Sequence, residues 1–219
     1  MRELPEILDE VNATIAAACA KAGRRADEVE IVAVTKTHGP DVIREAWEAG
    51  LHIVGENKVQ EAAWKQPLAV SGPDWHLIGH LQKNKVRPAL SLFTTFHSID
   101  SLALIDRLQT VAEELGAQPH ILLEVNMSGE RSKDGMRPDE VPFAVERALA
   151  SSSLTLEGFM TMAPHTPDDV FLKKVFTELY DLMYNIKHKY QVELNELSMG
   201  MSSDYKIAVE SGSTMIRLG

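Results

Sequence analysis

The chain has 219 residues, of which 44% are hydrophobic and 25% charged, and its formal net charge is −10 at pH 7. The length allows one large domain or two small ones, and the composition is typical of a soluble globular protein. The negative charge argues against a nucleic-acid-binding scaffold, because neutralising phosphates requires clustered Lys and Arg. No apolar run approaches the roughly 20 residues needed to span a bilayer, and no basic amphipathic stretch indicates a membrane surface.

The first predicted element is an amphipathic helix over residues 3–20, which contains the single cysteine, Cys19. One cysteine excludes an internal disulfide and is typical of a reducing compartment. Cys19 is in step with the apolar positions of this helix, so we interpret it as a buried hydrophobe rather than a reactive thiol. The N-terminus has neither a signal-peptide pattern nor a lipid-anchor motif, and we expect a cytoplasmic protein.

After this helix, strand-like and helix-like patterns alternate along the chain. The expected strands are 31–36, 52–54, 75–78, 95–99, 120–126, 156–160, 194–198 and 214–218. The expected helices are 40–49, 57–65, 82–89, 101–115, 138–150, 168–190 and 203–210. Eight strands separated by helices predict an α/β fold, a (β/α)₈ TIM barrel that forms one domain over residues 1–219 with an extra N-terminal helix.

An open, doubly wound sheet has the same alternation and is the structural alternative. The count of eight favours the barrel, and no strand–helix turn carries a Gly-x-Gly-x-x-Gly fingerprint. In such a barrel, functional groups gather where strands end and the following loops begin. Polar or glycine-containing segments stand at several predicted strand ends: Lys36, 55–57, Gly79, Asn126, 198–204 and 217–219.

Lys36 ends the apolar, β-branched run that begins at Ile31. Lysine is rarely buried without a partner. At the end of an interior strand its surroundings can lower its pKa and make it a nucleophile toward a carbonyl. A lysine in a solvated loop is the ordinary alternative, and this run alone does not decide between the two.

The segment 200–204, Gly-Met-Ser-Ser-Asp, has the composition of a phosphate cradle. Glycine lets the backbone approach an anion, hydroxyls donate hydrogen bonds, and a following helix points its N-terminus at the ligand. An ordinary helix cap by Ser202 or Ser203 would explain the same residues. Phosphates in (β/α)₈ proteins are often held by the loops after the seventh and eighth strands, where Gly219 would supply the second loop. A phosphate there and Lys36 on the neighbouring first strand would together hold a small phosphorylated aldehyde.

Arg217 alternates with apolar neighbours, which predicts an inward guanidinium, whereas a terminal arginine extending to solvent is the alternative. Asn57 can either bind a ligand oxygen or cap the next helix. We interpret Met201 as core and pocket filler. The polar loop 130–135 is expected to be solvated, with a role as a lid as the alternative.

The sequence argues against two other kinds of site. The eight histidines lack metal-ligand spacing, so no metal is expected. There is no Gly-x-Ser-x-Gly elbow, which argues against serine-hydrolase chemistry.

Together these segments resemble the pyridoxal phosphate homeostasis proteins, the YggS/PROSC family, over nearly the full length of the chain. The blocks that carry the resemblance are 32–36 (VAVTK), 55–57 (GEN), 75–79 (WHLIG), 82–85 (QKNK), 158–162 (GFMTM), 198–202 (SMGMS) and 212–219 (GSTMIRLG). The resemblance implies a fold type III barrel, like the N-terminal domain of alanine racemase, with pyridoxal 5′-phosphate (PLP) as the cofactor.

The resemblance also assigns roles to particular residues. It implies that Lys36 forms a Schiff base with PLP, that Ser202 and the Gly219 amide bind its phosphate, and that Arg217 faces the pyridine nitrogen. Asn57 and Met201 are expected to line the same pocket. Family members continue past the position of Gly219 with a small hydroxyl residue and a short helical segment. From this difference we expect part of the phosphate site to be missing.

The expected function is PLP binding for intracellular PLP homeostasis or transfer, without substantial catalysis. An arginine, whose pKa exceeds ~12, cannot accept the ring proton that makes PLP a strong electron sink. Alanine racemases also use a tyrosine from a second domain, whereas the tyrosines of this chain fall on predicted helices. We expect a monomer with apo forms of PLP-dependent enzymes as recipients. The alternatives are a fold type III amino-acid racemase or lyase, and a cofactor-free Schiff-base aldolase.

Overall fold

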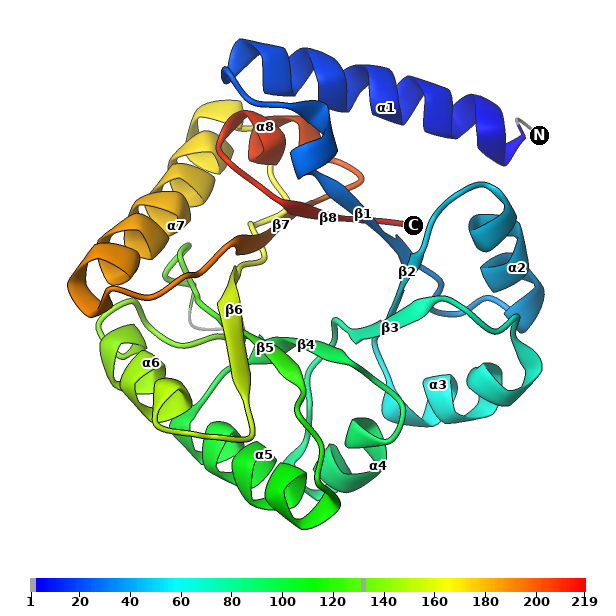
Figure 1. The fold of residues 1–219 in the computed structure, drawn as a ribbon. Helices are drawn as coiled ribbons and strands as arrows, with labels where there is room; N and C mark the ends of the chain where they lie inside the picture. The colour runs from blue at the N-terminus through cyan, green and yellow to red at the C-terminus, as the bar shows by residue number, and fades with distance from the viewer. Residues whose placement is uncertain (1–2, 131–132) are drawn as a thin grey trace.

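Eight parallel strands close into a barrel, with helices around the outside, in a computed structural model that describes residues 3–130 and 133–219 (Figure 1). The strands are β1 Glu30–Val34, β2 Ile53–Glu56, β3 Asp74–Leu77, β4 Thr95–Ile99, β5 His120–Glu124, β6 Thr155–Met160, β7 Glu196–Met201 and β8 Met215–Leu218. They are hydrogen-bonded in chain order, and β8 pairs with β1. The predicted (β/α)₈ barrel is therefore confirmed.

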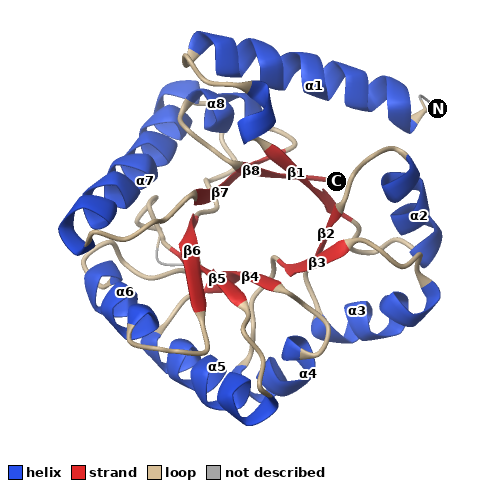
Figure 2. Ribbon diagram, viewed as in Figure 1, coloured by secondary structure: helices blue, strands red, loops and turns tan. Residues whose placement is uncertain are grey.

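The helices form a ring outside the strands, as Figure 2 shows. They are α1 Leu4–Lys21, α2 Pro40–Glu48, α3 Val59–Lys65, α4 Val86–Leu90, α5 Leu102–Leu115, α6 Val141–Leu149, α7 Asp169–Tyr190 and α8 Tyr205–Glu210, with short 3₁₀ turns at Ala26–Glu28, Gln66–Leu68 and Lys83–Lys85. None of the described helices is long and apolar enough to cross a membrane.

The predicted helix 82–89 is divided in the structure into a 3₁₀ turn and the short helix α4. The physical reason is Pro88, whose nitrogen has no hydrogen to donate to the carbonyl group of residue 84. A continuous α-helix through this segment would lack that bond.

Several predicted strand ends were wrong by a few residues. β2 continues through Gly55 to Glu56, and β7 continues through Gly200 to Met201, although both were predicted to stop earlier. Gly200 has a φ of +98° at a register shift between β7 and β8, which is a bulge that glycine permits. Conversely, β1 stops at Val34 and β5 at Glu124, so Lys36 and Asn126 lie two residues past their strands rather than at the strand ends.

Helix α1 covers the outside of the barrel beside α8 and β8 (Figure 1). Its residues Ile15, Ala18 and Cys19 pack with Val209 and Ile216 in a small apolar cluster. Cys19 is 1% exposed, and burial raises the pKa of its thiol. The interpretation of Cys19 as a buried hydrophobe is confirmed.

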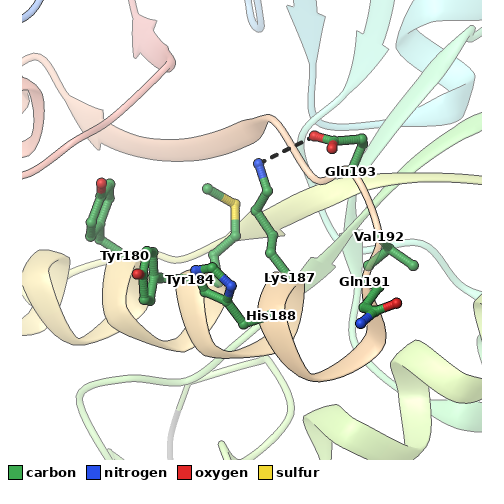
Figure 3. Close-up of a pocket in the computed structure, with 8 residues that line it drawn as sticks. Tyr180, Tyr184, Lys187, His188, Gln191, Val192 and Glu193 are labelled. Atoms are coloured by element: carbon green, nitrogen blue, oxygen red, sulfur yellow. Dashed lines mark ion pairs between the residues drawn. The ribbon is translucent and has the colours of Figure 1, made fainter.

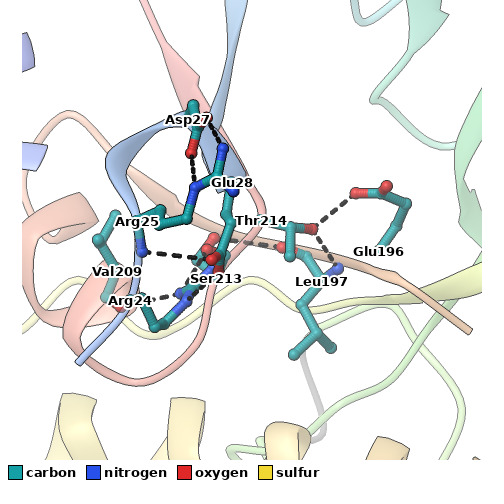
Figure 4. Close-up of polar contacts among 9 residues, drawn as sticks. All are labelled: Arg24, Arg25, Asp27, Glu28, Glu196, Leu197, Val209, Ser213 and Thr214. Carbon is teal, nitrogen blue, oxygen red and sulfur yellow. Dashed lines mark hydrogen bonds and ion pairs between the residues drawn. The ribbon is translucent and has the colours of Figure 1, made fainter. Parts of the chain in front are cut away.

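The turn after α1 also fixes the last two strands, as Figure 4 shows. Arg24 donates hydrogen bonds to the carbonyl oxygens of Val209, at 3.2 Å, and Ser213, at 2.9 Å. Thr214 accepts a hydrogen bond from the Leu197 amide and donates one to the Glu196 carboxylate. The entry to β8 is therefore tied both to the N-terminal helix and to the start of β7.

Close packing of β6 against β7 requires glycine at position 158, because a Cβ there would overlap the Glu196 carbonyl oxygen. We predict that Gly158→Ala lowers the free energy of unfolding by about 1–3 kcal/mol or more, the usual cost of overpacking. Urea unfolding measures this change. Gly39→Ala is the matched control, because Gly39 has an ordinary φ of −74° and a Cβ there meets nothing within 4 Å. Equal stability of the two variants would contradict the prediction.

Candidate functional site

A cavity of about 380 Å³ opens where the strands end. It is lined by Val34, Lys36, Asn57, Ile78, Gly79, His80, Glu124, Asp134, Met162, Met201, Ser202, Arg217 and Gly219. All six residues that the sequence predicted for a cofactor site, namely Lys36, Asn57, Met201, Ser202, Arg217 and Gly219, lie around this one cavity. Their roles toward a ligand stay predictions, but the expected convergence of distant segments is observed.

Asn126 was predicted to belong to the same rim, but its side chain organises its own loop. Its amide oxygen accepts hydrogen bonds from Ser128 and from the backbone nitrogen of Gly129. Its amide nitrogen donates to the Glu130 carbonyl oxygen at 2.7 Å. In the loop 130–135, residues 131–132 lie outside the described residues, so the prediction of a lid is not tested.

One end of the cavity brings together the ends of β7 and β8. The amide of Gly219 donates to the Ser202 hydroxyl oxygen, at a nitrogen–oxygen distance of 3.4 Å. The helix-capping alternative for Ser202 and Ser203 is wrong, because Asp204 is the N-cap residue of α8 and its carboxylate accepts from the Met201 amide at 2.6 Å. A hydroxyl and a backbone N–H therefore stand together at the cavity wall, which are donors that suit an anion.

Asn57 does not cap the following helix, since the N-cap of α3 is Lys58. Its place is in the loop between β2 and α3, on the wall of the cavity. Of the two roles that the sequence left open for Asn57, contact with a ligand is the one that this position allows.

Arg217 points into the barrel, as its alternation with apolar residues predicted. It is only 5% exposed, so the alternative of an arginine extending to solvent is wrong. Its guanidinium donates to the Ser198 hydroxyl at 2.6 Å and to the Thr161 carbonyl oxygen at 3.1 Å. Burial lowers the pKa of Arg217 to about 10, opposed by the charges of Glu124 and Asp204. The side chain is therefore a fixed cation at neutral pH that donates hydrogen bonds and accepts none.

Arg217 is the end of a chain of polar side chains that crosses the barrel. The Ser198 oxygen lies 2.8 Å from Nδ1 of His97, Nε2 of His97 lies 2.9 Å from Nδ1 of His76, and Nε2 of His76 lies 3.5 Å from the Asp74 carboxylate. Burial holds the pKa of His97 well below its usual range, so this ring is neutral. Arg217 can only donate hydrogen bonds. We therefore infer that the Ser198 hydroxyl donates a hydrogen bond to Nδ1 of His97 and that Nε2 of His97 donates one to Nδ1 of His76.

The hydrogen bonds between these polar side chains all run in one direction, from the Arg217 cation at one end to the Asp74 carboxylate at the other. The pKa of Asp74 is lowered to about 2, mainly by its hydrogen bond to His76. The ionised carboxylate and the guanidinium therefore polarise the two imidazoles in the same sense. Sequence reasoning missed the chain, because its members come from β3, β4, β7 and β8. The available signal was a histidine in each of two neighbouring predicted strands, His76 in β3 and His97 in β4.

Within residues 3–130 and 133–219, no three His, Cys, Asp or Glu side chains gather in a way that could hold a metal ion. The polar chain described above contains two histidines and one aspartate, but its members bind one another in sequence. The cavity wall carries the Lys36 amine, the Arg217 guanidinium and the Ser202–Gly219 pair, which are groups that suit an organic anion.

A second hollow, of about 500 Å³, lies on the outer surface of the C-terminal part of α7 (Figure 3). It is lined by Tyr180, Met183, Tyr184, Lys187, His188, Gln191, Val192 and Glu193. Helices of a (β/α)₈ barrel run opposite to their strands, so this hollow belongs to the end where the strands begin. None of its residues belongs to the cavity at the strand ends, and we assign it no chemistry.

Known proteins share the sequence pattern of this chain over nearly its full length. Residues 8–219 match the family "Alanine racemase, N-terminal domain". A pyridoxal phosphate homeostasis protein of Aquifex aeolicus is 35% identical over 98% of this chain and 94% of its own length. One of Pseudomonas aeruginosa is 36% identical over 100% of this chain and 94% of its own length. The chain belongs to the pyridoxal phosphate homeostasis protein family.

Solved structures agree with this family assignment. PipY of Synechococcus elongatus, solved with PLP bound, is 35% identical and has a TM-score of 0.83 over 94% of this chain and 97% of its own. An alanine racemase of Clostridium difficile is only 14% identical but has a TM-score of 0.77 over 96% of this chain and 55% of its own. The homeostasis protein family therefore has the barrel of alanine racemase, and this chain spans about half of that enzyme.

Glu124 lines the cavity and is 5% exposed, and sequence reasoning did not single it out. Burial is the main cause that raises the pKa of its carboxyl group from 4.5 to about 7, and Asp100 and Asp134 act in the same direction. The cavity of this chain therefore contains an acid whose pKa lies near neutral pH.

The raised pKa of Glu124 predicts a pH-dependent stability. Between pH 4.5 and about 7 the folded state binds more protons than the unfolded state, so stability falls as pH rises through this window and then levels off. We predict that Glu124→Gln, which cannot ionise, gains up to about 3 kcal/mol relative to the wild type between pH 5 and pH 8. Urea unfolding at the two pH values measures this, with the exposed Glu48→Gln as control. A stability difference that is the same at both pH values would refute the prediction.

Proposed function

We propose that this protein binds PLP at the mouth of its barrel, covalently through Lys36, and serves as a carrier in PLP homeostasis. The observation that carries the proposal is the single cavity that joins an amine, an anion-binding pair and a fixed guanidinium. The names of its relatives and the PLP bound to PipY support the same ligand. They also count against a cofactor-free aldolase.

The residues around the cavity fit PLP in their chemistry. When bound, PLP supplies an aldehyde that condenses with an amine and a ring that can accept electrons. Lys36 provides the amine, and the paired hydroxyl of Ser202 and amide of Gly219 provide donors for the phosphate. Arg217, held by Ser198 and Thr161, provides a donor toward the ring nitrogen. The aldehyde, the phosphate and the ring nitrogen therefore each have a partner of the matching kind.

The same residues favour holding the cofactor over using it. Arg217 stays cationic at neutral pH and offers the ring nitrogen a hydrogen bond, not a proton. The ring is then a weak electron sink, which disfavours carbanion chemistry. The four tyrosines lie on α7 and α8, and none lines the cavity. A tyrosine base like that of alanine racemase is therefore not provided by these positions.

One observation favours a second candidate, a racemase or lyase of small amino acids. Glu124 lines the cavity with a pKa of about 7, which suits a general acid or base. If it acts in this way, added alanine or serine should be racemised or deaminated in many turnovers, and Glu124→Gln should abolish the product. The carrier function requires only spectral changes with these amino acids, with no product above the level without protein.

A carrier must also release its cofactor. We predict that protein loaded with PLP and freed of excess ligand restores the activity of an apo-enzyme that needs PLP, while its own visible absorbance declines in step. Lys36→Ala, purified in the same way, should retain little cofactor and restore little activity. Loaded protein that leaves the apo-enzyme inactive would count against a carrier.

The phosphate contacts predict a selective loss of affinity. Ser202→Ala removes one hydrogen bond to a charged group, worth roughly 1.5–3 kcal/mol, so the affinity for PLP should fall about tenfold to a hundredfold. Pyridoxal, which has no phosphate, should bind this variant as it binds the wild type. Ser203→Ala is the matched control, since Ser203 does not line the cavity. Titration followed by absorbance measures the affinity of the wild type and of both variants for PLP and for pyridoxal. Equal losses of affinity for both ligands in Ser202→Ala would exclude a phosphate role for Ser202.

A further inference from the structure

We propose that Glu56, Glu61 and Lys65 form a charged clamp that fixes the backbone on both sides of Lys36, with Glu61 as a positioning residue for its reaction with an aldehyde. The inference rests on the proposed function, because it concerns how readily Lys36 reacts with PLP. Glu61 and Lys65 were not singled out by the sequence, Glu56 entered there only within the segment 55–57, and none of the three lines the cavity.

Lys65 is the centre of the clamp. Its side chain is 0% exposed, and its ammonium nitrogen lies 2.7 Å from the Glu56 carboxylate and 2.6 Å from the Glu61 carboxylate. It also donates to the Thr35 carbonyl oxygen at 2.7 Å. These three contacts use all three hydrogens of the ammonium group. A buried lysine is costly unless it is paired and hydrogen-bonded, and Lys65 has a partner for each of its hydrogens, whereas Oε2 of Glu56 is buried without one.

The contacts of the clamp end on the two residues that flank Lys36. On one side, Lys65 holds the Thr35 carbonyl group, and the Thr35 hydroxyl donates to the Glu56 carboxylate at 2.6 Å. On the other side, the Thr37 amide donates to the Glu61 carboxylate at 2.6 Å. One cluster of charges therefore fixes the backbone before and after Lys36.

Thr37 shows that this backbone is under strain. Its φ is +67°, a left-handed conformation that is a genuine outlier for a β-branched residue. Such conformations are costly and persist where the surroundings hold them, most often at functional sites. Two contacts hold this turn: the Thr37 amide donates to Glu61, and the His38 amide donates to the Thr35 carbonyl oxygen at 3.2 Å.

The clamp bonds the residues on both sides of Lys36 and makes no hydrogen bond or ion pair with the Lys36 side chain. A reacting group held in position loses less freedom when it reaches its target, and small misplacements can cost up to about a hundredfold in rate. The clamp should therefore govern the covalent step at Lys36 without contributing to contacts with the phosphate or the ring.

Two probes separate these effects. PLP can react with Lys36, whereas pyridoxine 5′-phosphate has the same ring and phosphate but no aldehyde. Glu61→Ala removes the acceptor for Thr37, Glu61→Gln keeps an oxygen acceptor, and Glu48→Ala is a control at an exposed helical glutamate. The rate of the visible absorbance change and of borohydride trapping reports the covalent step. The affinity for pyridoxine 5′-phosphate reports the other contacts.

We expect Glu61→Ala to slow trapping of PLP by roughly tenfold while its affinity for pyridoxine 5′-phosphate changes less than twofold. Glu61→Gln should recover most of the rate, and Glu48→Ala should match the wild type. The Glu61 side chain is 22% exposed, which favours a folded variant. If Glu61→Ala does not fold, Thr35→Val tests the other side of the clamp, and slower trapping is expected there too.

Two results would overturn the inference: trapping at the wild-type rate in the folded clamp variants, or equal losses of both ligands. A wild-type protein that forms no adduct at Lys36 would instead overturn the proposed function and this inference with it. The failure of the clamp and the failure of the proposed function are therefore distinguishable.

Discussion

Closure of the barrel by pairing β8 with β1 is the constraint on which the site depends. The register places Arg217 opposite Val32, so the ends of the two strands lie side by side. As a result the loop with Lys36 meets Gly219, although 183 positions of sequence separate them (219 − 36). A Cβ at Gly219 would lie 3.0 Å from the Val34 carbonyl oxygen, which shows how closely these strand ends approach. Without the β8–β1 pairing, a sheet with this strand order would leave the lysine and the anion-binding pair on opposite edges.

Two buried cations, Arg217 inside the barrel and Lys65 on α3, are held in different ways, and each bears on function. Arg217 is compensated by neutral partners and by a directed chain of hydrogen bonds that ends at Asp74. It therefore keeps its charge and serves as a donor. Lys65 is compensated by two carboxylates, and its contacts fix the backbone around Lys36. The first arrangement suits a cofactor whose ring is a weak electron sink. The second holds the backbone of Lys36 in place for binding that cofactor. Both are consistent with a protein that holds PLP and returns it.

The alternation of strands and helices could be predicted because the patterns of apolar residues are local. The count of eight strand–helix units then favoured a closed barrel over an open sheet. The strand ends could not be placed as well. Gly55 and Gly200 suggested turns, but they remain within strands because close packing and a bulge require glycine there. The six residues of the predicted cofactor site were predictable from their place after strands and from the family resemblance, but Glu124, which lines the same cavity, was not. The roles of Lys65 and His97 were not predictable. Both partners of His97, and the Glu56 and Thr35 partners of Lys65, lie on other segments, and a local pattern does not identify such partners.

The central claim is that PLP is held covalently at Lys36, and the most direct measurement is the site of the adduct. Protein incubated with PLP and reduced with borohydride would be digested, and the modified peptide identified by mass spectrometry. The account predicts one modified residue, Lys36, and no adduct in Lys36→Ala. An adduct that maps mainly to another lysine, such as Lys58 or Lys83, or that persists unchanged in Lys36→Ala, would contradict it.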